Sequence, residues 1–293
     1  MSESPVLSVS PVTVPAPGRA VELRVRVSAP MTGDGLPIIL LSHGLGFSNH
    51  LSSLNGYAPL VNFWAARGFA VIQPTHLDSK TLSLEVSDAW RTRTQDMKHV
   101  FDGLDAIEAA VPSLAGRLDR DKVAVVGHSM GGHTASLLLG ARVDEDLSEP
   151  RIKAGVLLAA PGNGGVTEFV SENYPFLSAM DFSSMTAPAL VVAGEKDTST
   201  HLTVRGAEWH ADPYFQAPGP KALLSLVDAE HGLGGISGYD VAETTDENPD
   251  RVAVVQELTT AYLRSTLYPG DASWQAARDG LSAEFGHVES KDS

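Results

Sequence analysis

The chain has 293 residues, 43% of them hydrophobic, which is enough for one large α/β domain or two small ones with a buried core. It carries 21 Lys and Arg against 36 Asp and Glu, a formal net charge of −15, which argues against a surface that binds nucleic acid or an anionic membrane. It contains no cysteine, which excludes disulfides, thiolate metal sites and a cysteine nucleophile.

The beginning of the chain and its apolar stretches bear on where the protein is located. Its first residues contain neither the basic nor the apolar segment of a secretory signal peptide. No stretch approaches the roughly 18 consecutive apolar residues of a membrane span. We therefore expect a cytoplasmic protein; the alternative is a secreted protein whose signal peptide has been removed. Residues 1–18 are rich in proline and are expected to form an extended arm.

Strand and helix patterns alternate from residue 21 to residue 267. Strict alternation of apolar and polar residues over 21–27 predicts a half-exposed strand. Continuous apolar runs predict buried strands at 37–42, 69–74, 122–128, 154–160, 189–194 and 222–227, the last of these being the last strand expected. Helices are predicted at 58–67, at 91–111, from the end of the 122–128 strand to about 141, and at 251–267.

Strands that alternate with helices through short connections predict a parallel sheet covered on both faces, in one domain of the α/β class. The domain is expected over residues 19–268. Residues 269–293 are expected to form a polar tail, with a short helix at 274–281.

Residues 123–132 read VAVVGHSMGG, an apolar strand that enters Gly-x-Ser-x-Gly and continues into a helix. This order is the one in which a nucleophilic serine, here Ser129, is held at a sharp and strained turn. Gly127 and Gly131 supply the space that such a turn requires. The helix N-terminus behind the serine favours negative charge that develops there. The alternative is a glycine-rich turn with a solvated serine.

A nucleophilic serine needs a base, and the base needs a carboxylate that holds it. In this architecture the chain order is Ser, then Asp or Glu, then His, each just after a strand. Asp197 follows the strand at 189–194, and His231 follows the strand at 222–227. The sequence therefore predicts Asp197 as the acid and His231 as the base.

Five other acidic and histidine residues lie in the same part of the chain. Glu195 is the alternative acid, although it lies nearer the strand end. Asp228 and Glu230 are interpreted as solvated loop charges. His201 and His210 do not directly follow a strand, so we interpret them as surface or core histidines.

Acyl transfer also requires donors for a tetrahedral oxyanion. One is expected from the residue after the nucleophile, the backbone N–H of Met130. The second is expected from the loop after an early strand, where residues 43–46 read HGLG, and we assign it to the backbone N–H of Leu45. Phe47, on the same loop, is a candidate for contact with substrate. The alternative for this loop is an ordinary glycine turn.

Two pairs of charged or titratable residues allow more than one interpretation. His76 and Asp78 follow a strand, so they either line the cleft or form a loop salt bridge. Arg93 and Asp96 are spaced i, i+3 on a predicted helix and are interpreted as a surface ion pair.

No metal or cofactor is expected. His128 and His133 flank the serine, but their spacing does not match a metal-binding pattern such as His-Glu-x-x-His. The chain contains neither Gly-x-Gly-x-x-Gly nor a P-loop, so no nucleotide cofactor is indicated.

Over residues 20–267 the chain resembles the α/β-hydrolase superfamily. The resemblance rests on HGLG at 43–46, GHSMGG at 127–132, and GEKD at 194–197 with EHG at 230–232. The chain looks most like the platelet-activating-factor acetylhydrolase, chlorophyllase and PET-hydrolase-like group, and it also resembles dienelactone-hydrolase-like proteins. Dienelactone hydrolases use a cysteine nucleophile, where this chain has serine. The chain also lacks the disulfides of secreted cutinase-type polyesterases.

The resemblance implies an α/β-hydrolase fold, with a mostly parallel central sheet flanked by helices. Caps in this superfamily are inserted at the position of residues 161–188, a segment too short here for a large cap. We hypothesise that this segment is an apolar lid over a hydrophobic acyl or alcohol group and that residues 209–220 form another wall. The alternative is that its large apolar side chains only anchor the loop. Candidate substrate-binding residues are Gly44, Phe47, His128, Phe169 and Phe176.

These residues together predict a cofactor-free serine esterase, a carboxylic-ester hydrolase that cleaves a hydrophobic small-molecule ester of moderate to large size through an acyl-enzyme. Two alternatives use the same catalytic triad of Ser129, His231 and Asp197. They are lactone opening and acyl transfer to an alcohol. A third is a ligand-binding protein on a hydrolase scaffold that catalyses nothing.

Overall fold

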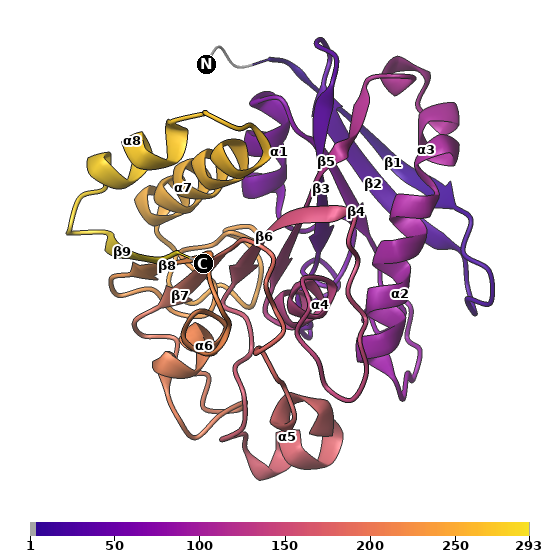
Figure 1. Cartoon of the computed structure of the whole chain (residues 1–293). Helices are drawn as coiled ribbons and strands as arrows, with labels where there is room; N and C mark the ends of the chain where they lie inside the picture. The colour runs from indigo at the N-terminus through magenta and orange to yellow at the C-terminus, as the bar shows by residue number, and fades with distance from the viewer. Residues whose placement is uncertain (1–3, 293) are drawn as a thin grey trace.

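The computed structural model describes residues 4–292, which form a nine-stranded sheet between layers of helices (Figure 1). The strand order across the sheet is β1-β2-β4-β3-β5-β6-β7-β8-β9. The strands are β1 (Val6–Val14), β2 (Leu23–Pro30), β3 (Leu36–Ser42), β4 (Ala70–Pro74), β5 (Leu118–His128), β6 (Ile152–Leu158), β7 (Ala189–Gly194), β8 (Lys221–Leu226) and β9 (Gly286–Lys291).

The central strands are parallel, and the sheet ends in antiparallel strands. β4, β3, β5, β6, β7 and β8 pair in parallel, whereas β1, β2 and β9 pair antiparallel to their neighbours. Ser42 of β3 lies opposite Gly127 of β5 in this register. The loop after β3 therefore begins beside the turn that carries Ser129.

Helices cover both faces of the sheet. The α-helices are α1 (Ala58–Ala66), α2 (Ala89–Asp102), α3 (Leu104–Ala110), α4 (Met130–Leu138), α5 (Glu168–Asn173), α6 (Asp212–Gln216), α7 (Pro249–Leu267) and α8 (Ser273–Gly280). Short 3-10 helices are η1 (Pro112–Leu114), η2 (Pro175–Ser178) and η3 (Ala207–Ala211).

Two apolar clusters lie on opposite faces of the sheet, because successive strand residues point to opposite sides. Ile38 and Leu40 pack into the cluster that contains α2, α3 and α4, whereas Ile39 and Leu41 pack into the cluster with α1 and α7. The predicted sheet, covered on both faces, is therefore confirmed.

The structure differs from the expected elements at three places. The helix predicted over 91–111 is divided into α2 and α3 at Gly103, where a Cβ would lie 2.3 Å from Val14 Cγ1. The expected N-terminal arm forms β1, an edge strand paired with β2. The expectation that 222–227 is the last strand is wrong, because residues 286–291 form β9 and pair with β8. The sheet therefore extends beyond residues 19–268.

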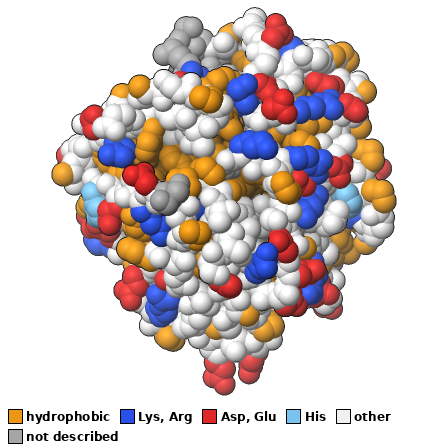
Figure 2. All heavy atoms as spheres, viewed as in Figure 1, with side chains coloured by type: hydrophobic (Ala, Val, Ile, Leu, Met, Phe, Trp, Pro, Cys, Tyr) orange, Lys and Arg blue, Asp and Glu red, His pale blue; other side chains and the backbone are white. Residues whose placement is uncertain are grey.

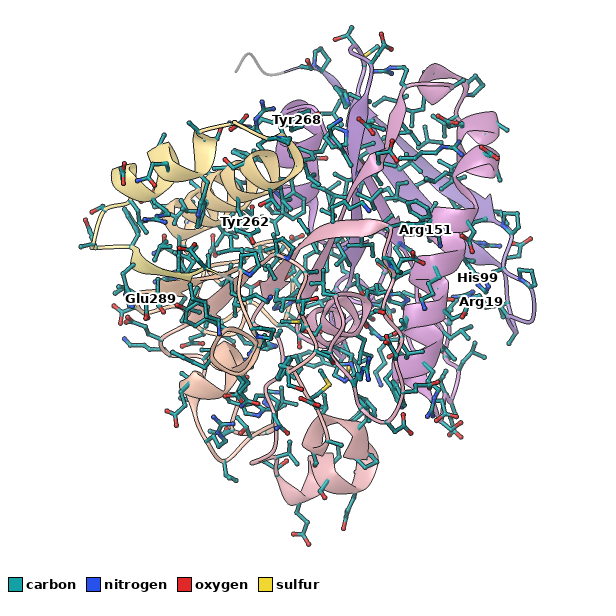
Figure 3. The ribbon with its side chains drawn as sticks, viewed as in Figure 1. Arg19, His99, Arg151, Tyr262, Tyr268 and Glu289 are labelled. Atoms are coloured by element: carbon teal, nitrogen blue, oxygen red, sulfur yellow. The ribbon has the colours of Figure 1, made fainter. Side chains whose placement is uncertain are left out.

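Acidic and basic side chains are interspersed on the face shown in Figure 2. Arg151, labelled in Figure 3, pairs with Asp102 and Glu149 and lies 4.1 Å from the centre of the Phe101 ring. The pair with Asp102 is exposed, and exposed pairs contribute about 1 kcal/mol or less to stability. Within residues 4–292, no helix has the length and apolar character needed to cross a membrane.

Candidate active site

The turn between β5 and α4 holds Ser129 in a conformation that side chains rarely adopt, with φ 54° and ψ −120°. Its glycines are required by close backbone contacts. A Cβ on Gly127 would lie 1.9 Å from the Gly131 carbonyl oxygen, and a Cβ on Gly131 would lie 2.0 Å from the Ser42 carbonyl oxygen. The strained serine and the need for both glycines agree with the sequence prediction.

Three side chains from separate loops form one chain of hydrogen bonds. Ser129 Oγ lies 2.9 Å from His231 Nε2, and His231 Nδ1 lies 2.7 Å from Asp197 Oδ2. Ser129 follows β5, Asp197 follows β7 and His231 follows β8, so the carboxyl ends of the parallel strands bring them together. Glu195, the alternative acid, is exposed.

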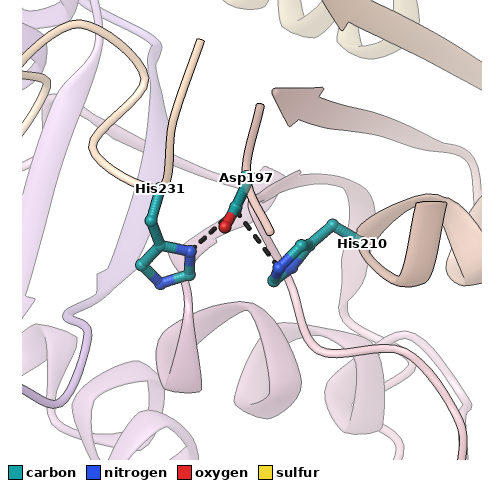
Figure 4. Close-up of side chains that lie close together, drawn as sticks. All are labelled: Asp197, His210 and His231. Carbon is teal, nitrogen blue, oxygen red and sulfur yellow. Dashed lines mark hydrogen bonds and ion pairs between the residues drawn. The ribbon is translucent and has the colours of Figure 1, made fainter. Parts of the chain in front are cut away.

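Asp197 is buried and accepts from more than one side chain. Ser199 Oγ donates to its Oδ1 at 2.6 Å, and His210 Nε2 lies 3.2 Å from its Oδ2 (Figure 4). Burial by itself would raise the pKa of Asp197, but the His231 imidazole and hydrogen bonds from His210 and His231 outweigh burial and lower it. Asp197 is therefore a carboxylate near neutral pH.

Buried side chains hold the HGLG loop in place through hydrogen bonds. His43 donates Nδ1–H to the Gly44 carbonyl at 2.7 Å and accepts the His76 N–H at Nε2 at 3.1 Å. Arg93 Nη1 donates to the His43 carbonyl oxygen at 2.7 Å. The backbone N–H of Gly44 donates to the Tyr57 hydroxyl at 2.9 Å. These contacts fix the backbone just before Leu45.

Met130 is the first residue of α4, so its N–H has no acceptor within the helix. It lies directly after Ser129, at the positive end of the helix dipole. The Met130 N–H and the loop after β3 are therefore on the same side of the molecule as the serine, since Ser42 lies opposite Gly127.

His128 is placed differently from the expectation that it contacts substrate. Its ring is buried, Nε2 lies 2.9 Å from the His231 carbonyl oxygen, and Nδ1 lies 2.8 Å from the Tyr57 hydroxyl. A carbonyl only accepts, so Nε2 carries the proton and Nδ1 accepts from Tyr57. Burial lowers the pKa of His128 to about 3, so this ring is neutral. It links the loop of His231 to the loop of Gly44.

The interpretation of Arg93 and Asp96 as a surface ion pair is wrong. Arg93 is buried and pairs with Asp78, with Nε 2.7 Å from Oδ2. Asp96 pairs with Arg19 at 2.8 Å, beside α2 in Figure 3, and with His76 at 3.0 Å. Of the two alternatives for Asp78, the salt bridge is therefore the one observed. The helical spacing did not show that this face of α2 is covered by other loops.

The segment between β6 and β7 folds into α5 and η2 and is only partly packed. Phe176, Met180, Phe182 and Met185 are buried in the core cluster, so they anchor the segment. Phe169 on α5 is 59% exposed, and Phe47 on the HGLG loop is 74% exposed. These two are the substrate-binding candidates whose rings are open to solvent.

A segment that the sequence analysis did not single out holds two loops of the site. Glu243 Oε1 accepts from the backbone N–H of Ser48 at 2.8 Å. Asp246 Oδ2 accepts from the backbone N–H groups of Glu230 and Gly234, at 2.9 and 3.0 Å. One side chain thus holds the HGLG loop and the other holds the loop of His231.

His210 is another residue that sequence reasoning missed at the site, since it was interpreted as a surface or core histidine. Asp197, His210 and His231 place one ligand atom each within 4.8 Å of one another, so this group is the one among residues 4–292 with a geometry suited to a metal ion. The two nitrogen–oxygen distances, 2.7 and 3.2 Å, are also those of hydrogen bonds and ion pairs.

Comparisons with known proteins agree with the fold. The model of the alpha/beta hydrolase family matches residues 38–286. The chain is also similar to Cutinase est2 from Thermobifida alba, with 26% identity over 180 residues. This match covers 60% of the chain and 48% of the cutinase, so the matched region spans about half of that relative's length.

Proposed function

The chain belongs to the alpha/beta hydrolase family, and from this premise we propose that it is a serine hydrolase that cleaves carboxylic esters through an acyl-enzyme. The observation that carries this proposal is the continuous chain of hydrogen bonds from Ser129 through His231 to Asp197. Similarity to a cutinase supports ester hydrolysis as the reaction class.

In the proposed mechanism Ser129 Oγ attacks the ester carbonyl carbon while its proton passes to His231 Nε2. Asp197 accepts the His231 Nδ1–H and stabilises the imidazolium. The tetrahedral oxyanion accepts hydrogen bonds from the N–H groups of Leu45 and Met130. His231 then returns the proton to the leaving alkoxide, and the acyl-enzyme forms.

Water attacks the acyl-enzyme in the second half of the proposed reaction. His231 Nε2 takes a proton from the water, the carbonyl carbon passes through a second oxyanion, and the bond to Ser129 Oγ breaks. The proton returns to Oγ, and the carboxylic acid leaves. The strain of the turn keeps Oγ clear of the backbone in both halves.

We propose that Phe47 and Phe169 contact the apolar part of the ester. Both rings are exposed, and an exposed aromatic ring gains free energy when an acyl chain covers it. The Gly44 backbone is proposed to approach the substrate from the loop after β3, whereas the buried Phe176 is proposed only to support the segment that carries Phe169.

The proposal is tested by hydrolysis of p-nitrophenyl esters of increasing acyl length and by labelling with a fluorophosphonate. Ser129→Ala is expected to lower kcat/KM by roughly 10⁴-fold or more and to abolish labelling. Ser136→Ala is the matched control, because this buried serine on α4 donates only to the Gly132 carbonyl at 2.9 Å. Equal activity of Ser129→Ala and wild type would exclude Ser129 as the nucleophile.

A further inference from the structure

Glu243 contacts the HGLG loop just after Leu45, the proposed oxyanion donor. Its Oε1 accepts the backbone N–H of Ser48 at 2.8 Å. A Cβ on Gly46 would lie 3.0 Å from Glu243 Cδ, so the side chain also packs directly against the Gly46 backbone. The proposed mechanism does not use this carboxyl group.

The contacts before Leu45 set the direction of its N–H. His43 Nδ1 donates to the Gly44 carbonyl oxygen at 2.7 Å. A trans peptide is planar, with its C=O and N–H on opposite sides. The Leu45 N–H belongs to the same peptide as the Gly44 carbonyl and therefore points away from the His43 ring.

The direction of this N–H also depends on the residues that follow Leu45. Gly46 has no Cβ, so its backbone has more conformational freedom than that of other residues. Phe47 is 74% exposed and does not anchor the loop in the core. The bond from the Ser48 N–H to Glu243 is therefore the anchor on this side of Leu45.

Asp246, three residues after Glu243, holds the loop of His231. Its Oδ2 accepts the backbone N–H groups of Glu230 and Gly234, at 2.9 and 3.0 Å. Arg251 Nη1 lies 3.2 Å from the same oxygen. A guanidinium is always charged in proteins, so this ion pair fixes Asp246 from the side of α7.

The connection between these two anchors is short and lies beside the proposed base. Three Cα–Cα steps separate Glu243 from Asp246, so their Cα atoms are at most about 11 Å apart. A Cβ on Gly232, the residue after His231, would lie 3.6 Å from Thr244 Cα. Residues 243–246 therefore tie the HGLG loop to the loop of the base.

We propose that Glu243 is a positioning residue of the reaction, which holds the Leu45 N–H at a fixed place relative to His231. The inference rests on the proposed function, because it assumes that Leu45 donates to the oxyanion. A displaced donor loses more of its interaction with the transition state than with the bound ester. The role requires an acceptor oxygen at the right reach, and it does not require a charge.

The test compares three substitutions of Glu243 by the kinetics of a p-nitrophenyl ester. Glu243→Ala removes the acceptor, and its kcat is expected to fall about tenfold, with KM within about threefold of wild type. Glu243→Asp is one methylene shorter and is expected to lose kcat to a similar degree. Glu243→Gln keeps an acceptor oxygen at the same reach and is expected to retain kcat within about threefold.

The infrared band of an isotope-labelled acyl-enzyme carbonyl is the second measurement. Hydrogen bonds from the oxyanion donors polarise this carbonyl and lower its stretching frequency. The band is expected at higher frequency in Glu243→Ala, or in Glu243→Asp if the alanine variant does not fold, and at the wild-type frequency in Glu243→Gln. A loss of stability alone would not move this band.

Glu247→Ala is the matched control, because Glu247 is an exposed glutamate on the same loop. Its kcat and its carbonyl band are expected to match wild type. A wild-type kcat and band in Glu243→Ala would overturn the inference, as would an equal loss of kcat in Glu243→Gln and Glu243→Ala. If the wild-type protein neither hydrolyses esters nor reacts with a fluorophosphonate, the proposed function fails first and the inference falls with it.

Discussion

At the scale of single residues, the site depends on neutral histidines whose protons are fixed by their partners. His128 is the clearest example, because the His231 carbonyl requires a proton on Nε2 and the Tyr57 hydroxyl then donates to Nδ1. The same hydroxyl accepts the Gly44 N–H. One phenol therefore connects the proposed base to the proposed oxyanion loop.

Tyr57→Phe is expected to lower kcat about tenfold with a smaller change in KM. It leaves the Gly44 N–H and His128 Nδ1 without partners inside the protein, at a cost of about 1–3 kcal/mol in unfolding free energy. A displaced Gly44 loop weakens a contact that matters most in the transition state. Ester kinetics and denaturant unfolding measure the two effects.

Tyr262→Phe is the control for this change, because Tyr262, labelled in Figure 3, is a buried tyrosine on α7. Its ring packs against that of Trp274 on α8. It is expected to leave kcat at the wild-type value. A Tyr57→Phe protein that loses stability but keeps its full kcat would show that the hydroxyl supports folding and not the oxyanion loop.

At the scale of elements, the turn between β5 and α4 joins three strands. Gly131 lies against the end of β3, and Gly132 lies against Ala160 after β6, where a Cβ would be 2.6 Å from the Ala160 Cβ. The strained φ of Ser129 persists because these contacts hold α4 directly over the sheet. The turn that carries Ser129 therefore packs α4 against the sheet and also positions the proposed nucleophile.

Gly131→Ala is expected to destabilise the protein by more than about 3 kcal/mol, because its Cβ would collide with the backbone of β3, which cannot yield as a flexible side chain can. Gly280→Ala is the control, since a Cβ at this end of α8 meets nothing within 4 Å. It is expected to change stability by less than about 0.5 kcal/mol. Thermal unfolding of both proteins measures the difference, and similar melting temperatures would contradict the packing argument.

At the scale of the whole molecule, the loops after β3, β5, β7 and β8 lie at the same edge of the parallel sheet. Several histidines are buried near these loops. Burial lowers the pKa of His128 and His133 to about 3, and it lowers the pKa of His43 and His76 well below the ordinary value of 6.5. These rings are neutral in the folded protein and take up protons when the chain unfolds in acid.

The unfolding free energy is therefore expected to fall as the pH decreases below 6.5 and toward 3. Above pH 6.5 each ring is neutral in both the folded and the unfolded protein. Its full contribution to the unfolding free energy is therefore present there. Below it, each histidine contributes a slope of about 1.4 kcal/mol per pH unit. Denaturant unfolding at about pH 7.5 and about pH 5.5 measures the loss. Equal stability at both values would mean that these rings are protonated in the fold.

Proton uptake provides the matched measurement for this prediction. Unfolding at about pH 5.5 is expected to take up roughly four protons from these four rings. His133→Phe removes one of them, next to the Phe176 ring at 5.0 Å, and is expected to take up about one proton fewer. An uptake that does not change in this variant would contradict the assignment for His133.

The sequence by itself determined the central strands, most helices and the order Ser129, Asp197, His231, because these depend on local patterns. Continuous apolar runs form strands wherever both faces of a sheet are covered, and chain order places residues after the ends of those strands. The three side chains predicted in this way are the ones that the structure connects by hydrogen bonds.

Only the tertiary structure decided the rest. β1 and β9 are edge strands whose partners no local pattern identified: β1 pairs with the next strand, β2, and β9 pairs with β8 from beyond α7 and α8. Arg93 and His210 carry no local pattern that separates a buried contact from a surface one, and their partners are set by loops from other strands. Burial, charge compensation and the direction of a side chain are properties of the packed molecule, because they depend on which distant segments come together.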